Sequence, residues 1–390
     1  MIADKPIKIG FDAKRIVSNA TGLGNYGRTL VNALSEADEA DRLLLYAPGR
    51  GREELVKQVQ LRDNVFFVYP QPYGGLNPLR MLTSKGSLWR SRGILRDLRR
   101  DGVELYHGLS GELPVGISRL GIKTVLTVHD LIFLRHPEYY NPVDVQLYKL
   151  KFRLSLREAT RIVAISECTK RDILAFGNYP EQNIDVIYQS CGKGFAERAT
   201  ADQCRQVKQH YHLPDDFILQ VGTIEPRKNA LLAVKALQAL PANLHLVLIG
   251  RSTDYERTLK KYAGSHGVLS RLHILHGVPT SHLYAIYQQA ACFAYPSRYE
   301  GFGLPVIEAI QSGLPVVAAT GSCLEEAGGE HCIYVQPDDV KAFAGAVMAL
   351  LPGAPDRAER IALSQQYVAR FENNDTALRM LQEYARVLSN

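Results

Sequence analysis

Short runs of aliphatic and β-branched residues recur along the chain and alternate with segments rich in glycine, proline and polar residues. Many of the intervening segments repeat apolar residues at helical spacing. Runs that are apolar almost throughout indicate strands that are covered on both faces. Strands that alternate with helices favour parallel, doubly wound sheets, so we predict the α/β fold class. The predicted strands lie at residues 7–11, 43–47, 65–69, 104–107, 123–129, 161–165, 184–188, 217–221, 244–249, 272–276, 292–295, 315–318 and 332–335.

The pattern of strand, glycine-containing loop and helix begins again near residue 216, which indicates two domains. Two glycines in the segment 190–195 suit a hinge between them. We therefore predict two Rossmann-like domains that face each other across a cleft. The expected limits are 1–195 for the N-terminal domain, 196–365 for the C-terminal domain, and 366–390 for a helix that packs back on the N-terminal domain.

The composition is that of a globular protein, with 46% apolar and 22% charged residues in a chain of 390. These proportions exclude a collagen, a coiled coil and a disordered chain. No apolar run is long enough to cross a membrane, and no secretory signal precedes the first strand. We therefore expect a cytoplasmic protein.

The six cysteines are scattered through both halves, and none lies in a C-x-x-C pair or in a cluster with zinc spacing. We expect free thiols in a reducing compartment. The net charge of +6 is compatible with an anionic ligand but does not require one.

The segment Gly22–Gly27 matches the glycine pattern G-x-G-x-x-G of dinucleotide-binding folds. That pattern must directly follow the first strand, and a carboxylate must follow the second. Here ten residues separate Phe11 from Gly22, and no carboxylate follows the strand that ends at Tyr46. An NAD-dependent dehydrogenase is therefore disfavoured. N–H groups at the start of the next helix could still bind an anion at Thr21–Gly24, and an ordinary glycine loop is equally consistent with these residues.

The segment from Tyr295 to Glu308 has the sharpest chemical pattern. A strand ends at Tyr295, a helix is expected to begin at Pro305, and the loop between them contains Glu300-Gly-Phe-Gly303. N–H groups exposed at such a junction bind anions. Glu300, at the mouth of the loop, and Glu308, one turn into the helix, are suited to accept hydrogen bonds from sugar hydroxyls. The alternative is a tight turn with two surface glutamates.

Two further pairs of polar residues follow predicted strands. Arg227 and Lys228 follow the first strand of the second domain, at the edge where α/β sheets bind ligands, and could hold a diphosphate. His129 and Asp130 follow an apolar strand of the first domain and could contact a substrate hydroxyl. The alternatives are a solvated charged turn for the first pair and a buried histidine with a satisfied ring for the second.

Together these residues resemble the GT-B glycosyltransferases, specifically the retaining family 4, over nearly the whole chain. In the first domain the likeness lies in Gly10–Lys14, Thr21–Gly24, Val128–Asp130 and Ile165–Asp172. In the second domain it lies in Val221–Asn229 and in the pair Glu300 and Glu308, with seven residues between them. The glutamate pair is highly specific to this family, whereas the loop at Gly24 is not.

The resemblance implies that the second domain binds a nucleotide-diphosphate sugar. Arg227 and Lys228 would bind the diphosphate, and Glu308 would bind the ribose hydroxyls. Many members carry an arginine where this chain has Thr223, so the role carries over more firmly to Lys228 than to Arg227. The transferred sugar and the distal phosphate would be held by Glu300 and by the backbone N–H groups of Gly301, Phe302, Gly303 and Leu304.

For the first domain, the resemblance implies acceptor binding. His129 and Asp130 would lie against the donor sugar, with His129 and Glu300 as the catalytic residues, and Gly24 would lie at the phosphates or at the acceptor entrance. The family retains the anomeric configuration, so we expect an oxocarbenium-like transition state with attack on the same face. The chain has no D-x-D triplet, and we therefore expect neither a metal nor another cofactor. The cations and a helix N-terminus would stabilise the departing diphosphate.

Basic residues gather at positions 80–100, which also hold the only tryptophan, Trp89. Basic helices with tryptophan and leucine can lie on anionic lipid, so we predict peripheral membrane contact through 80–100. A solvated helix face with one packed tryptophan is the alternative. Stacking aromatics are not interleaved with the cations, so nucleic acid is not an expected partner. The basic residues are Arg80, Lys85, Arg90, Arg92, Arg96, Arg99 and Arg100, and a second series at helical spacing is Lys149, Arg153 and Arg157.

We therefore predict a metal-independent, retaining hexosyltransferase of surface polysaccharide biosynthesis. Its acceptor would be a glycan or a lipid-linked saccharide. The segment Glu225–Asn229 is similar to that of mannosyltransferases for surface polysaccharides, which favours mannose as the transferred hexose. A sugar-nucleotide epimerase and an inactive sugar-nucleotide-binding protein are the alternatives.

Overall fold

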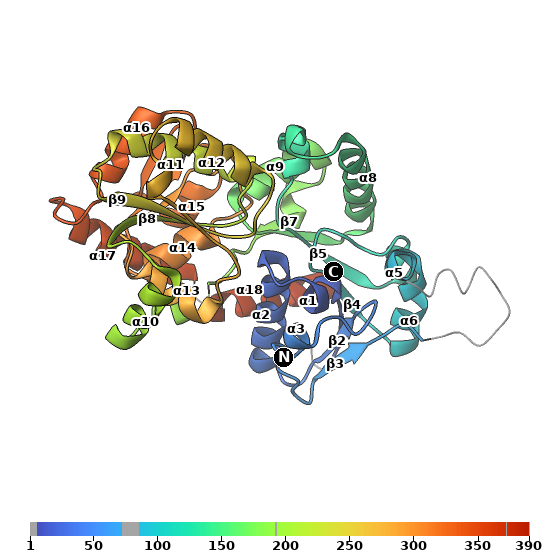
Figure 1. Ribbon diagram of the computed structural model, residues 1–390. Helices are drawn as coiled ribbons and strands as arrows, with labels where there is room; N and C mark the ends of the chain where they lie inside the picture. Colours follow the sequence, from blue (N-terminus) through green and yellow to red (C-terminus); the bar gives the residue numbers. More distant parts are fainter. Residues whose placement is uncertain (1–5, 72–85, 192, 372, 390) are drawn as a thin grey trace. The chain divides into compact units, whose positions relative to one another are not determined.

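Two compact units make up the structure, a computed structural model that describes residues 6–71, 86–191, 193–371 and 373–389 (Figure 1). The N-terminal unit comprises residues 1–189 and 373–390, and the C-terminal unit comprises residues 190–372. The unit boundaries therefore differ from the limits at 195 and 365 expected from the sequence. Residues 190–195 belong to the C-terminal unit because the N–H group of Cys191 donates to the carbonyl of Phe371 at 3.4 Å and the ring of Phe195 lies 4.6 Å from that of Tyr284.

A parallel seven-stranded sheet forms the centre of the N-terminal unit, in the order β3-β2-β1-β4-β5-β6-β7. The chain runs outward from β1 to β3 and then returns to the other side of β1 with β4, so the strand order reverses between β1 and β4. The strands are β1 Lys8–Asp12, β2 Arg42–Tyr46, β3 Val65–Val68, β4 Leu105–Gly108, β5 Lys123–Val128, β6 Arg161–Ala164 and β7 Ile184–Val186.

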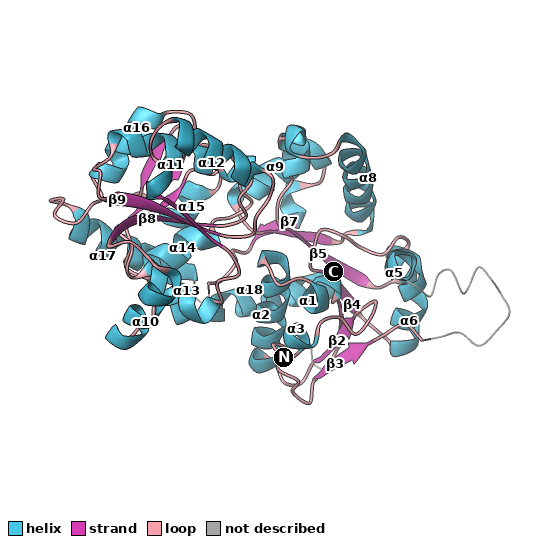
Figure 2. Cartoon of the chain, in the orientation of Figure 1, coloured by secondary structure: helices cyan, strands magenta, loops and turns pink. Residues whose placement is uncertain are grey.

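Helices cover both faces of this sheet (Figure 2). Successive strand residues point to opposite faces, so Leu43 and Leu45 pack with α1, α2 and α18, while Leu44 and Tyr46 pack with α6, α8 and α9. A π-helical turn at Trp89–Gly93 precedes α6. The helices are α1 Lys14–Ser18, α2 Gly22–Ala37, α3 Glu53–Val56, α5 Gly86–Leu88, α6 Ile94–Asp101, α7 Ile132–Arg135, α8 Pro142–Glu158, α9 Glu167–Gly177 and α18 Asn373–Ser389.

The C-terminal helix α18 packs on α2 of the N-terminal unit. The hydroxyl of Tyr384 lies 2.6 Å from Nδ1 of His107, and Nε2 of His107 lies 2.7 Å from the hydroxyl of Thr127. A buried ion pair between Arg161 and Glu383 adds a second link. Because these partners lie on β4, β5 and β6, the last helix of the chain completes the core of the first unit.

The C-terminal unit repeats the design with a parallel six-stranded sheet in the order β10-β9-β8-β11-β12-β13. Here the strand order reverses between β8 and β11. The strands are β8 Asp216–Val221, β9 Leu244–Ile249, β10 Leu272–Leu275, β11 Cys292–Tyr295, β12 Val316–Ala319 and β13 Ile333–Val335.

One apolar core of the C-terminal unit joins α11, α12 and α16 to β8, β9 and β11. Helices α14, α15 and α17 pack on one another, and Phe371, after α17, packs on Phe302 with ring centroids 5.4 Å apart. The helices are α10 Ala201–Tyr211, α11 Ala230–Ala236, α12 Tyr255–Ser265, α13 Thr280–Tyr287, α14 Leu304–Gln311, α15 Leu324–Gly328, α16 Val340–Met348 and α17 Arg357–Val368.

The structure confirms the α/β class and two Rossmann-like units with parallel sheets. Every strand predicted from the sequence is present, with each end within two residues of the expected position. In the described part of the chain, no helix is both long enough and apolar enough to cross a membrane.

Candidate functional site

The loops that follow β8 and β11 lie side by side at the carboxyl edge of the C-terminal sheet. These two strands are hydrogen-bonded neighbours, with Cys292 opposite Ile218. They flank the position where the strand order reverses, and at such a position the connecting loops diverge and leave a crevice for a ligand. The predicted residues Arg227, Lys228 and Glu300 are carried by these two loops.

Local backbone geometry sets the course of the loop after β8. Gly222 has φ +146°. A Cβ atom at Gly250, directly after β9, would lie only 1.8 Å from the carbonyl oxygen of Gly222. The two glycines therefore let β8 and β9 approach closely. Asn229, at φ +54°, donates from Nδ2 to the carbonyls of Pro296 at 3.1 Å and Pro337 at 2.7 Å. This asparagine fastens the β8 loop to the β11 loop.

An ionic cluster joins the two loops. Lys228 Nζ lies 2.5 Å from Glu300 Oε1 and 2.6 Å from the hydroxyl of Tyr295. Arg227 lies 2.9 Å from Glu300 Oε2 and 2.6 Å from Glu225 Oε1, and it also donates to the carbonyl of Tyr299 at 2.7 Å. The side chains of Arg227, Lys228 and Glu300 are only 15%, 13% and 11% exposed. The cluster is therefore largely shielded from solvent, and the electrostatic interactions between its charges are strong.

Glu300 remains a carboxylate in this environment. Burial alone would raise the pKa of Glu300, but the charges of Lys228 and Arg227 outweigh burial and hold that pKa below its usual value. The hydroxyl of Ser297 donates to the same carboxylate at 2.5 Å. For Arg227, the paired carboxylates outweigh burial and raise the pKa of the guanidinium.

Helix α14 begins at Leu304, one residue before the expected start at Pro305. The N–H groups of Val306 and Ile307 donate to the carbonyl of Gly303 at 2.9 and 3.2 Å. A Cβ atom on Gly303 would lie 2.6 Å from the Cβ atom of Ala327, so this glycine allows α14 to pack on α15. Gly301 and Phe302 are buried in the loop just before the helix.

Glu308 lies one turn into α14, where it is partly buried. It accepts a hydrogen bond from the hydroxyl of Tyr287 at 3.0 Å. Burial dominates at this position and raises the pKa of Glu308 to about 7. The two predicted glutamates therefore differ, because the carboxylate of Glu300 is paired with cations, whereas no ion pair to Glu308 is found among the described residues.

His129 and Asp130 follow β5 in the N-terminal unit. Nε2 of His129 donates to the carbonyl of Leu109 at 2.8 Å, and Nδ1 accepts from Gln189 at 2.7 Å. Burial lowers the pKa of His129 to about 4, so the ring is neutral at physiological pH. Asp130 accepts from the N–H group of Ile132 at 3.2 Å. This is the geometry expected for a buried histidine with a satisfied ring.

Gly24 lies inside α2, which begins at Gly22, and not in a loop before the helix as predicted. Its N–H group donates to the carbonyl of Thr21 at 2.9 Å and to Oδ1 of Asn19 at 3.4 Å. A Cβ atom on Gly24 would lie 1.8 Å from the carbonyl oxygen of Asn19. The close approach of the preceding turn therefore requires glycine here, whatever binds nearby.

The expected membrane segment at 80–100 is described only from position 86 on, and two of its residues are not available at the surface. Trp89 is only 1% exposed, and its Nε1 donates to Asp97 at 2.8 Å. Arg90 forms ion pairs with Asp12 at 2.7 Å and with Glu112 at 3.1 Å, with 9% of its side chain exposed. Trp89 and Arg90 therefore belong to the core of the N-terminal unit, and the alternative of a packed tryptophan is the one observed.

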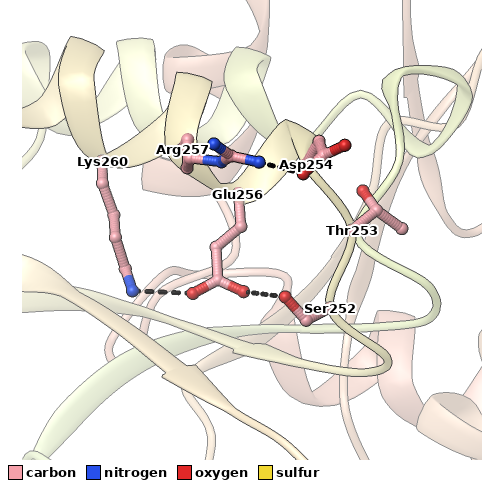
Figure 3. A pocket seen from close by; sticks show the side chains of 6 residues that line it. All are labelled: Ser252, Thr253, Asp254, Glu256, Arg257 and Lys260. Carbon is pink, nitrogen blue, oxygen red and sulfur yellow. Dashed lines mark hydrogen bonds and ion pairs between the residues drawn. The ribbon is translucent and has the colours of Figure 1, made fainter.

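A surface hollow of about 590 Å³ lies beside the start of α12 (Figure 3). There Glu256 accepts from Ser252 at 2.7 Å and pairs with Lys260 at 2.7 Å. The hollow is lined by Ser252, Thr253, Asp254, Glu256, Arg257 and Lys260, so none of the predicted site residues lines it. The candidate site therefore rests on the two loops and not on this hollow. In the described part of the chain, no group of three or more His, Cys, Asp or Glu residues could hold a metal ion.

Sequence reasoning missed three residues that shape the site and its surroundings. Ser297 and Tyr287 contact the two glutamates, and nothing in their local sequence distinguishes them from other loop and helix residues. Asn19 shapes the turn before α2 by accepting from the N–H group of Thr21, the N-cap residue, at 2.8 Å. Asparagine side chains often bond the backbone N–H group two residues further on in a turn, so this role was predictable.

Comparison with known proteins connects both units to one group of enzymes. The profile of the family described as Glycosyl transferases group 1 matches residues 205–366. The profile of Glycosyltransferase Family 4 matches residues 20–190. O-antigen chain mannosyltransferase B of Escherichia coli is 30% identical over 359 residues, which cover 88% of this chain and 91% of that protein.

Solved structures share the fold over the whole length of the chain. A glycosyltransferase from Rickettsia africae superimposes with a TM-score of 0.76 at 17% identity and covers 100% of both chains. Anabaena HepE in complex with UDP and glucose has a TM-score of 0.74 at 16% identity and covers 97% of this chain and 100% of its own.

Proposed function

The chain belongs to the group 1 and family 4 glycosyltransferases and is a hexosyltransferase of GT-B fold, and we propose that its C-terminal unit binds a nucleotide-diphosphate sugar at the β8 and β11 loops. The observation that carries this proposal is the cluster of Arg227, Lys228 and Glu300 at the point where the strand order reverses. Two cations beside a helix N-terminus suit a diphosphate, and carboxylates suit sugar hydroxyls.

The contacts favour Lys228 over Arg227 as the diphosphate ligand. Arg227 is held by Glu225, by Glu300 and by the carbonyl of Tyr299, so its guanidinium mainly orients Glu300. Lys228 makes two contacts through a single rotatable ammonium, which can turn toward a phosphate while Arg227 still holds Glu300. The hexose and the distal phosphate would then be bound by Glu300 and by the N–H groups of the residues from Gly301 to Leu304. Glu308 would bind the ribose hydroxyls.

His129 takes a more limited role in this proposal than the catalytic one that the resemblance implies. Its ring is neutral and both of its nitrogens are engaged within the N-terminal unit. A proton transfer by His129 would require one of these hydrogen bonds to break. We therefore assign His129 to positioning, with Asp130, on the donor-sugar side of the reaction.

The transferred hexose in this proposal is mannose, and the acceptor is a glycan or a lipid-linked saccharide of a surface polysaccharide. Support comes from the 30% identity to O-antigen chain mannosyltransferase B over 88% of the chain. Turnover of GDP-mannose and of UDP-glucose, compared in one assay, tests the donor. Faster turnover of UDP-glucose would contradict the mannosyl assignment.

Transfer is proposed to retain the anomeric configuration without a metal ion. Lys228 and the N-terminus of α14 would stabilise charge on the departing diphosphate, which is electrostatic stabilisation by groups already in place. Activity is then expected to persist in EDTA. The product is expected to keep the configuration of the donor when its anomeric proton is observed by NMR.

Lys228→Ala tests the site itself. Removal of the ammonium should lower kcat/KM by about a hundredfold or more, the scale seen when one preorganised group is removed from a transition state. Lys341→Ala, which removes an exposed lysine from α16, is the matched control and should leave kcat/KM unchanged. Equal turnover by the two variants would exclude Lys228 from the reaction.

The same assay separates the alternative functions. A transferase consumes donor much faster when acceptor is present. An epimerase converts donor without acceptor, and an inactive binding protein leaves the donor unchanged in both cases.

A further inference from the structure

Helix α8, Pro142–Glu158, carries apolar side chains on two opposite faces. Val145 is buried, and Phe152 and Leu156 are buried in the core of the N-terminal unit. On the opposite face, Val143, Leu147 and Leu150 are 75%, 46% and 55% exposed. Their spacing of four and three residues aligns them in one row along the helix.

The exposure is concentrated on this helix. Among the described residues, eleven large apolar side chains are exposed, and four of them lie on α8 when Tyr148 is included. The other seven are distributed over separate segments of both units. Single exposed apolar residues are normal, whereas a contiguous row of them marks a surface that contacts something.

Cations extend the row toward the C-terminal end of the helix. Arg153 and Arg157 are exposed, they lie one turn apart, and no ion pair to either is found in the described part of the chain. Lys149 is partly buried on the same flank. We call Val143, Leu147, Leu150, Arg153 and Arg157 the α8 stripe. Figure 1 shows α8 at the periphery of the N-terminal unit.

We propose that the α8 stripe docks the N-terminal unit on an anionic membrane surface. A helix that lies in a lipid interface needs an apolar row to enter the acyl boundary and cations beside it to meet anionic headgroups, and α8 presents both. The inference does not depend on the donor site. It also moves the membrane contact away from residues 80–100, where Trp89 is buried.

A second copy of the chain fits the stripe less well. One row on a single helix of 17 residues offers far less than the roughly 800 Å² per partner that a stable interface buries. Parallel pairing of two such helices would also bring Arg153 and Arg157 of one copy against those of the other. The charge of the stripe is complementary to anionic lipid and not to itself.

Co-sedimentation of the full chain with vesicles tests the proposal. Vesicles of equal parts phosphatidylglycerol and phosphatidylcholine should bind the protein, binding should weaken as salt is raised, and pure phosphatidylcholine should bind it much less. The double substitution Leu147→Gln with Leu150→Gln should lower the partition coefficient by about tenfold or more. Arg153→Gln with Arg157→Gln should abolish the preference for phosphatidylglycerol.

The control variant replaces two equally exposed leucines elsewhere, Leu269→Gln with Leu378→Gln, which are 48% and 53% exposed. It should bind vesicles as the unchanged protein does. Thermal unfolding of all variants checks that they fold. Absence of binding to anionic vesicles, or equal binding by the α8 and control variants, would overturn the proposal. So would a dimer that dissociates when Leu147 and Leu150 are replaced, because the stripe would then be a contact between copies.

Discussion

At the scale of single residues, burial acts in opposite directions on the two glutamates of the candidate site. Glu300 touches two cations that outweigh burial and keep its pKa low. Glu308 receives one hydrogen bond from Tyr287, so burial raises its pKa to about 7. Glu300 is therefore ionised at all ordinary pH values, whereas Glu308 changes its charge near neutrality.

This difference predicts a pH dependence of donor binding. If Glu308 binds the ribose hydroxyls as a carboxylate, donor affinity should rise by up to about tenfold between about pH 6 and about pH 8, as the carboxyl group loses its proton. Isothermal titration with the nucleotide diphosphate measures the affinity. In Glu308→Gln the profile should become flat, and an unchanged slope would exclude Glu308 as its origin.

The Glu300 cluster predicts a stability effect that is separate from catalysis. Glu300→Ala leaves Lys228 largely buried without its carboxylate, while Arg227 keeps only its pair with Glu225, and this should cost about 3 kcal/mol of unfolding free energy. Glu300→Gln keeps a polar group in place and should lower the free energy of unfolding by less than Glu300→Ala does. Urea denaturation of both variants checks the order, and a smaller loss for alanine would contradict the cluster.

Sequence reasoning identified Glu300 and Lys228 separately, but it did not predict that they pair. They are separated by 72 residues, and only the adjacency of β8 and β11 brings them within 2.5 Å. The same limitation explains why the sequence left two alternatives open at Trp89. The sequence of its segment is compatible with an interfacial helix, and the contact with Asp97 and the core decides otherwise.

At the scale of elements, the loop between β11 and α14 depends on how closely α14 packs on α15. Gly303→Ala would place a Cβ atom 2.6 Å from Ala327 and should push the two helices apart, at a cost of about 1–3 kcal/mol. Donor affinity should fall in parallel, because Glu308 lies on α14. Thermal unfolding and donor titration are the measurements.

Gly345→Ala is the matched control for this prediction. Gly345 is exposed in α16, and a Cβ atom there meets nothing within 4 Å. Alanine is the better helix former, so this variant should be as stable as the parent or slightly more stable. If Gly303→Ala and Gly345→Ala have the same stability and the same donor affinity, close packing at Gly303 is not important for the loop between β11 and α14.

At the scale of the whole molecule, the last helix of the chain stabilises the first unit. The hydroxyl of Tyr384 contacts a fully buried His107, so Tyr384→Phe leaves a ring nitrogen without its partner. This should cost the N-terminal unit about 1–3 kcal/mol. Hydrogen exchange should show faster opening of β4 and β5 and no change in β8 and β9. An equal increase in hydrogen exchange in both units would contradict the assignment of α18 to the N-terminal unit.

By itself, the sequence determined every strand, the α/β class and the two segments that carry Glu300 and Lys228. These features depend on local periodicity and on turn residues, which act over a few positions. Tertiary structure alone decided the strand order, the pairing of Arg227 and Lys228 with Glu300 and the burial of Trp89, whereas the packing of α18 on the first unit agrees with the sequence-based expectation. The physical reason is that burial and charge pairing depend on contacts between residues far apart in the sequence. Local sequence patterns do not encode such contacts.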